Sequence, residues 1–210
     1  MRGGARILAL CAALGTGAAA AQESPEDAAF NAATEAVRNH EFARAITLFT
    51  PLAEQDIADA QFNLAMLYKL GRGYPQNFTE AYYWGALALL GGGAYAADLV
   101  EEMGDALPDA GRSAVIDRLK ERLNTQIDGG DKLATRKLAR LFMELTAEPD
   151  YPAAYLWFSI CYALGDNACK EGRDDAADEL EPEALSTAQA ETAKTFATSA
   201  FARAPDTPAN

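Results

Sequence analysis

The chain has 210 residues, of which 50% are hydrophobic and 23% are charged, and its formal net charge at pH 7 is −13. Such an acidic surface repels nucleic acid and anionic lipid, so the composition argues against both as partners. The length is that of one domain with a substantial core.

The first 21 residues are expected to be a cleaved secretory signal peptide. Arg2 and Arg6 accompany a short apolar run over residues 7–14, and an Ala-x-Ala exit site ends at Ala21, before Gln22. The run is too short for a membrane span, and no later apolar run is long enough for one. We therefore expect cleavage near Ala21-Gln22 and a periplasmic or secreted protein of 189 residues, with a net charge near −15.

Helical patterns dominate the remaining chain, and no segment alternates with the period of a strand for more than a few residues. Apolar side chains recur at i, i+3 and i+4, as in Leu64, Leu67 and Tyr68, and the short connections favour antiparallel neighbours. The tail, residues 205–210, is expected to be disordered. The predicted helices span residues 25–38, 41–54, 57–70, 78–91, 94–106, 109–127, 131–145, 150–164, 167–180 and 183–203.

The chain repeats itself with a shift of about 74 residues. Equivalent positions carry similar side chains, which predicts a tandem helical array whose units bury each other's apolar faces. We expect one helical domain over residues 22–204, with units at about 25–56, 57–127 and 131–203. The predicted core of the repeats consists of Leu64, Tyr68, Ala81 and Trp84 in one unit, and of Leu138, Phe142, Ala154 and Trp157 in the next.

Gly71 and Gly73 raise the question of a phosphate-binding loop. Such a loop needs a preceding strand and a third glycine or a Gly-Lys-Ser/Thr ending, and neither is present here. The two glycines instead fit a turn between helices, with Gly71 in the left-handed position that ends a helix. Asn77 is expected to cap the next helix, with Glu80 at the capping-box position.

These residues resemble a Sel-one-like repeat, a relative of the tetratricopeptide repeat. The resemblance is specific over residues 42–92 and weaker over residues 131–203, where residues 146–150 replace the Gly-x-Gly loop. It implies an all-α, right-handed α-solenoid of antiparallel helix pairs that binds other proteins and has no catalytic residues. The matching positions are Ala58, Asp59, Ala60, Gln61, Leu64, Tyr68, Gly71, Gly73, Pro75, Gln76, Asn77, Ala81, Trp84, Ala88 and Gly92.

The resemblance also implies a groove lined by the first helix of each pair. The groove-facing positions are Phe62 and Met66 in one unit, and Arg136 and Arg140 in the next. An apolar pair beside two guanidinium groups suits a protein or peptide partner. The alternative for Phe62 and Met66 is that they pack on the helices over residues 25–54.

Two cysteines remain after signal cleavage, Cys161 and Cys169, and an even number in an exported protein favours a disulfide. The same spacing staples adjacent helices in cysteine-rich secreted Sel-one-like proteins. A redox-active thiol pair is the alternative, although the Cys-x-x-Cys spacing is missing.

Other features of the chain do not predict catalysis. His40 is the single histidine and no motif for a nucleophile or a zinc site occurs, so we expect no enzyme activity, no metal and no cofactor. The acidic run over residues 171–183 is either a solvated helix face or an attraction for a basic partner. The sequence thus predicts an exported, monomeric protein-interaction scaffold. The alternatives are a protein that binds or hydrolyses peptidoglycan or β-lactams, and a secreted effector that engages a host protein.

Overall fold

The computed structural model describes residues 24–93 and 95–203, and this part of the chain folds into helices without any strand. Each of the ten predicted helices is present, so the predicted all-α fold of helix pairs is confirmed. The expected signal peptide, its cleavage site and the tail at 205–210 lie outside the described residues. The helices are α1 (Pro25–Arg38), α2 (Phe42–Glu54), α3 (Ala58–Leu70), α4 (Phe78–Leu90), α5 (Ala96–Ala106), α6 (Asp109–Asp128), α7 (Lys132–Glu144), α8 (Tyr151–Ala163), α9 (Cys169–Asp178) and α10 (Pro182–Thr198), followed by a 3₁₀ helix, η1 (Ala200–Arg203).

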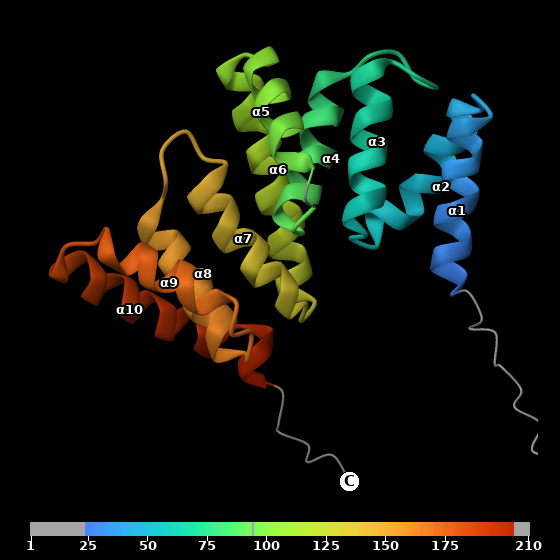
Figure 1. Cartoon of the computed structure of the whole chain (residues 1–210). Coiled ribbons are helices and arrows are strands. Elements are labelled where there is room, and N and C mark those ends of the chain that lie inside the picture. Colours follow the sequence, from blue (N-terminus) through green and yellow to red (C-terminus); the bar gives the residue numbers. More distant parts are fainter. Residues whose placement is uncertain (1–23, 94, 204–210) are drawn as a thin grey trace, which may run out of the picture.

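The helices form a curved array with α1 and α2 at one end and α8, α9 and α10 at the other (Figure 1). Most helices pack on their neighbours in sequence, as expected for a tandem array. Contacts beyond sequence neighbours are made by α6 with α4 and by α10 with α8. α5 and α6, which end the predicted unit 57–127, thus lie between α4 and α7.

The turn between α3 and α4 has the geometry expected from its glycines. Gly71 ends α3 with φ 64°, and Gly73 has φ 81°. The side chain of Asn77 accepts a hydrogen bond from the Glu80 amide at 3.1 Å and so caps α4. The prediction of a turn in place of a phosphate loop is therefore confirmed.

Gly73 also lies against the start of α2. A Cβ atom at Gly73 would come within 2.5 Å of the Phe42 carbonyl carbon and 2.6 Å of the Ala43 nitrogen. The neighbouring Arg72 guanidinium lies 5.1 Å from the centre of the Phe42 ring. The loop between α3 and α4 thus packs against the start of α2, and only glycine lets the two backbones come so close.

The core has two parts. A large cluster of buried side chains runs from α1 to α7, and a smaller cluster joins α7, α8 and α9. Phe142 and Trp157 are partly buried and contact both clusters. In contrast, α10 buries only Ala188, so this last helix is held by a small part of its surface.

A largely buried polar cluster centred on Asp56 links distant parts of the chain. One carboxylate oxygen of Asp56 lies 3.1 Å from the Lys137 ammonium and accepts a hydrogen bond from Gln126 at 2.7 Å. The other oxygen accepts a hydrogen bond from Gln61 at 3.0 Å. The Arg122 guanidinium lies 3.5 Å from the same carboxylate. Lys137 is only 7% exposed, so its ammonium group needs the Asp56 carboxylate as a counter-ion. The cluster joins the turn before α3 to α6 and α7.

Candidate functional site

A groove of about 810 Å³ lies between α5, α6, one side of α4, and the end of α7 with the loop that follows it. Small side chains keep it open: Gly104 on α5 lies against the Tyr82 ring, and Ala97 and Ser113 are exposed in its wall. We call it the acidic groove. Its floor is apolar and consists of Tyr82, Leu89, Val100, Ile116 and Leu145.

The rim of the acidic groove carries more negative than positive charge. Five carboxylates and two cations line it, a formal net charge of −3. The cations are Arg112 and Lys120, and the carboxylates are Glu101, Asp105, Asp109, Asp117 and Glu144.

Both cations of the rim already have acidic partners. Arg112 forms an ion pair with Asp109 and donates to the Gly104 carbonyl at 2.9 Å. Lys120 lies 3.9 Å from a carboxylate oxygen of Asp117. Burial raises the pKa of the Tyr82 phenol, an effect that nearby Arg112 partly offsets, so this floor residue stays a neutral phenol at physiological pH.

Two carboxylates of the rim, Glu101 and Asp105, have no ion pair or hydrogen bond within the described part of the chain. They are four residues apart on α5, so they share one face of the helix, and both are exposed. Like charges at this spacing destabilise a helix slightly. A cation placed between them would remove that repulsion.

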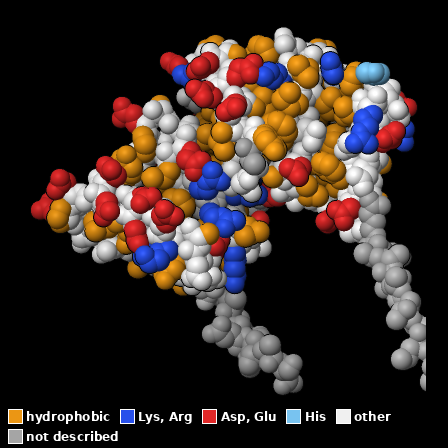
Figure 2. Space-filling view, viewed as in Figure 1, with side chains coloured by type: hydrophobic (Ala, Val, Ile, Leu, Met, Phe, Trp, Pro, Cys, Tyr) orange, Lys and Arg blue, Asp and Glu red, His pale blue; other side chains and the backbone are white. Residues whose placement is uncertain are grey.

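Figure 2 shows how unevenly charge is distributed over one face of the molecule. Asp and Glu side chains gather over α5 at the top, whereas Lys and Arg side chains gather lower down over α7. The helix α5 also supplies two of the rim carboxylates of the acidic groove, Glu101 and Asp105.

The residues expected to bind a partner do not share any of the three cavities described by the structure. Phe62 and Met66 are partly buried and pack against the main core, and they line none of these cavities. Arg140 donates to the carbonyls of Leu89 and Leu90 at 2.8 and 3.0 Å and pairs with Glu144. The Arg140 guanidinium thus caps the end of α4. The assignment of these residues to a partner stays a prediction.

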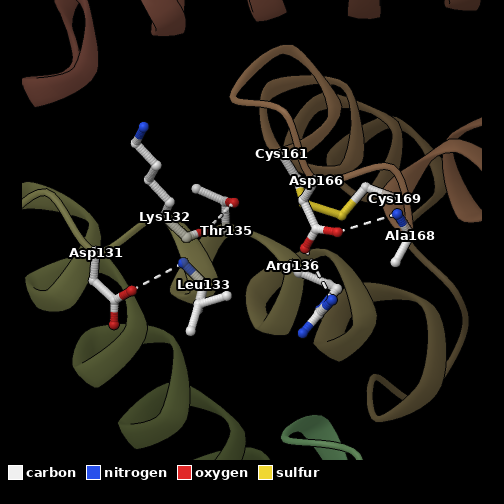
Figure 3. The surroundings of a disulfide bond; sticks show 9 residues. All are labelled: Asp131, Lys132, Leu133, Thr135, Arg136, Cys161, Asp166, Ala168 and Cys169. Carbon is white, nitrogen blue, oxygen red and sulfur yellow. Dashed lines mark hydrogen bonds and ion pairs between the residues drawn. A yellow bond between two sulfur atoms is a disulfide. The ribbon is translucent and has the colours of Figure 1, made fainter. Parts of the chain in front are cut away.

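Arg136, the second expected arginine, lies beside the disulfide. Its guanidinium is 2.9 Å from the Asp166 carboxylate, whose other oxygen accepts a hydrogen bond from the Ala168 amide at 3.1 Å (Figure 3). Cys161 and Cys169 are bonded, as expected, and join the end of α8 to the start of α9. The loop between them is thus held by a covalent bond and by an ion pair to α7.

The same residues are the chain's described candidate for a metal site. A sulfur of each cysteine and an oxygen of Asp166 lie within 4.8 Å of one another. Both sulfurs are used in their own bond, which leaves Asp166 as a single ligand, and this carboxylate is paired with Arg136. This arrangement suits a structural staple.

The residues predicted to form the core of the repeats are buried to different degrees. Leu64, Ala81, Trp84, Leu138 and Ala154 are buried. Tyr68, Phe142 and Trp157 are partly buried and pack against the core. No described helix is long and apolar enough to cross a bilayer.

The acidic groove was not predicted from the sequence, in which the acidic run over residues 171–183 is the more prominent cluster of carboxylates. In the structure Asp174 of that run pairs with Lys170 and Arg173. The signal that was present is the composition of residues 96–106, which include four acidic residues and no basic residue. Only packing reveals that two of these carboxylates border an apolar groove.

The helices define an all-α array of antiparallel pairs, and solved proteins of this kind are known. A protective antigen of uropathogenic Escherichia coli that displays an SLR fold is 19% identical, with a TM-score of 0.36 over 88% of this chain and 49% of that chain. A Sel1 repeat protein from Oxalobacter formigenes is 22% identical, with a TM-score of 0.31 over 75% of this chain and 47% of that one. This chain spans about half the length of each of these two proteins. No family model and no curated protein matches the sequence.

Proposed function

We propose that the protein is an exported, non-enzymatic scaffold that holds a segment of another protein in the acidic groove. The observation that carries the proposal is the groove itself, an open space of about 810 Å³ with an apolar floor and a charged rim. Sites of this kind bind chain segments through buried apolar anchors surrounded by polar contacts. Export is supported by the signal-type N-terminus and agrees with the disulfide.

Most of the groove lining comes from residues 97–120, outside the two segments that resemble repeats. Its walls come mainly from α5 and α6, which follow the Gly-x-Gly unit. The segments that resemble repeats therefore act as the rigid support, and α5 and α6 supply most of the binding surface. This division of roles differs from the groove expected at Phe62, Met66, Arg136 and Arg140, where both arginines are engaged in contacts within the chain.

A photo-crosslinking amino acid at Ser113 tests the proposal in intact cells. Ser113 and Ala114 are both exposed on α6, but only Ser113 lines the groove, so Ala114 is the matched control position. We expect a defined protein adduct from Ser113 and none from Ala114, identified by mass spectrometry. Identical adducts from both positions would contradict a binding groove.

A second experiment separates the scaffold from an enzyme acting on the cell wall. The purified protein is incubated with peptidoglycan fragments and with a chromogenic β-lactam. We expect neither to be hydrolysed, and steady turnover of either one would overturn the proposal.

A further inference from the structure

We infer that the segment held in the acidic groove is cationic and amphipathic, with Lys or Arg side chains beside an apolar side chain. This inference rests on the proposed function and adds the chemistry of the partner. It starts from the two unpaired carboxylates, Glu101 and Asp105, which are the described rim groups that lack a partner within the chain.

Charge complementarity selects the sign of the occupant. The groove has a formal net charge of −3, and its own cations are engaged by Asp109 and Asp117. An acidic segment would add repulsion to that of Glu101 and Asp105, whereas a basic side chain would meet two free carboxylates on one helix face. The net charge of the whole chain, −13, favours encounter with the same class of partner.

The floor requires an apolar side chain next to the basic ones. Ile116 is 6% exposed and Val100 is 6% exposed, so each presents a small apolar surface at the bottom of the groove. Leu145 and Leu89 are partly buried beside them. A small polycation without apolar groups would leave this surface wet, so an amphipathic segment is the better match.

The test uses two fluorescein-labelled synthetic peptides of equal length, one of Lys and Leu and one of Glu and Leu, together with spermine as an apolar-free polycation. Binding to the full-length protein is measured by fluorescence anisotropy for the peptides and by calorimetry for spermine. We expect the Lys/Leu peptide to bind more tightly than the other two, and its binding to weaken with added salt because exposed charge pairs are screened.

The decisive variant is the double neutralisation Glu101→Gln with Asp105→Asn. It should weaken binding of the Lys/Leu peptide roughly threefold to tenfold, since each exposed ion pair contributes little free energy. The matched control is Glu171→Gln with Asp175→Asn, because these carboxylates are also exposed and four residues apart but lie on α9, away from the groove. The control pair changes the net charge equally and should leave binding within about twofold.

A steric variant locates the site independently of charge. Ser113→Trp places a large side chain in the groove, and Ala114→Trp is its neighbour outside it. Only the first should reduce binding of the Lys/Leu peptide, with circular dichroism confirming that both variants are folded.

The outcomes separate the partner's chemistry from the scaffold function. Equal weakening by the two neutralised pairs would show attraction to bulk charge only, and equal binding of the Glu/Leu peptide or of spermine would overturn the cationic, amphipathic class. If a Ser113 crosslink to a protein is found while the Lys/Leu peptide fails to bind, this inference fails and the scaffold function stands. If the peptide binds as expected but no crosslink forms in cells, the inference about groove chemistry stands and the proposed function fails.

Discussion

Gly73 and Gly92 both have a positive φ, but only Gly73 lies against another part of the backbone. A Cβ atom at Gly92 (φ 88°) would meet nothing within 4 Å, whereas at Gly73 it would clash with the start of α2. Gly92→Ala should therefore cost about 1–2 kcal/mol of unfolding free energy from backbone strain alone. Gly73→Ala should lower the unfolding free energy by about 1–3 kcal/mol more than Gly92→Ala does, because the backbone at the start of α2 must also shift. Urea denaturation of both variants measures the difference, and equal losses would contradict the close contact.

Asp56 is the residue on which the buried polar cluster depends. Burial raises its pKa, but Lys137, Gln126 and Arg122 together lower it more, so the pKa lies below the ordinary value of 3.8. Asp56→Asn keeps the left-handed backbone at this position (φ 64°), which Asn tolerates, and leaves Lys137 buried without an anionic partner. We expect a loss of about 3 kcal/mol at neutral pH.

The pH dependence of that loss follows from the lowered pKa. Because the unfolded state binds the proton more readily, ionised Asp56 stabilises the fold above the unfolded pKa, and this contribution disappears as pH falls below about 4. Urea denaturation should therefore show the variant and the natural protein converging at acidic pH. Glu121→Gln, an exposed carboxylate on α6, is the control and should change stability by less than about 0.5 kcal/mol throughout. A constant difference across pH would contradict the assignment of Asp56 to the cluster.

At the scale of elements, α9 depends on its disulfide. This helix has ten residues, and its buried side chains are Cys169 and Ala176. Closing a loop with a sequence separation of 8 stabilises a fold by roughly 2–3 kcal/mol in the chain-entropy model. The double variant Cys161→Ala, Cys169→Ala should lose about that amount and show faster amide hydrogen exchange in α9, with α3 little changed.

Dithiothreitol supplies the control for that prediction. It should destabilise the natural protein by a similar amount and leave the double alanine variant unaffected. An unchanged natural protein, or faster exchange spread equally over all helices, would show that the bond does not hold α9.

The sequence predicted helices well and their packing only in part. Periodicity and the cap signals at Gly71 and Asn77 are local, so they located α3 and α4 to within a residue or two. The two tryptophans look equivalent in the repeat, yet Trp84 is 4% exposed and Trp157 is only partly buried between the two clusters. That difference depends on which later helices cover each one, and periodicity does not contain this information.

The acidic groove likewise depends on packing that the sequence pattern does not contain. None of the repeated core positions falls on Glu101 or Asp105, so the internal repeat assigned them no role. Their place on a groove rim depends on α5 and the end of α7, about 40 residues apart in the chain, lining the same groove. Likewise, the hydrogen bonds from Arg140 to the end of α4 depend on packing between helices about 50 residues apart, which a local pattern does not contain.

At the scale of the whole molecule, the Asp56 cluster joins the first part of the chain to α6 and α7. The division into three units stays a prediction. We expect a fragment that ends at Gly129 and one that begins at Gly130, in the turn after α6, each to lose the intact protein's cooperative unfolding. Thermal denaturation followed by circular dichroism and calorimetry checks this, and a fragment that melts cooperatively with the intact protein's midpoint would show that the halves are independent.

The close approach of Gly73 to Phe42 limits which groups of helices can be exchanged between arrays of this kind. Because the loop after α3 is shaped to the first turn of α2, the smallest transferable module begins at α2 and runs through α4. A chimera joined between α2 and α3 would separate the glycine loop from the α2 backbone that it packs against, and Arg72 from the Phe42 ring. Engineers who shuffle such arrays should therefore place their junctions in the connection that precedes Phe42.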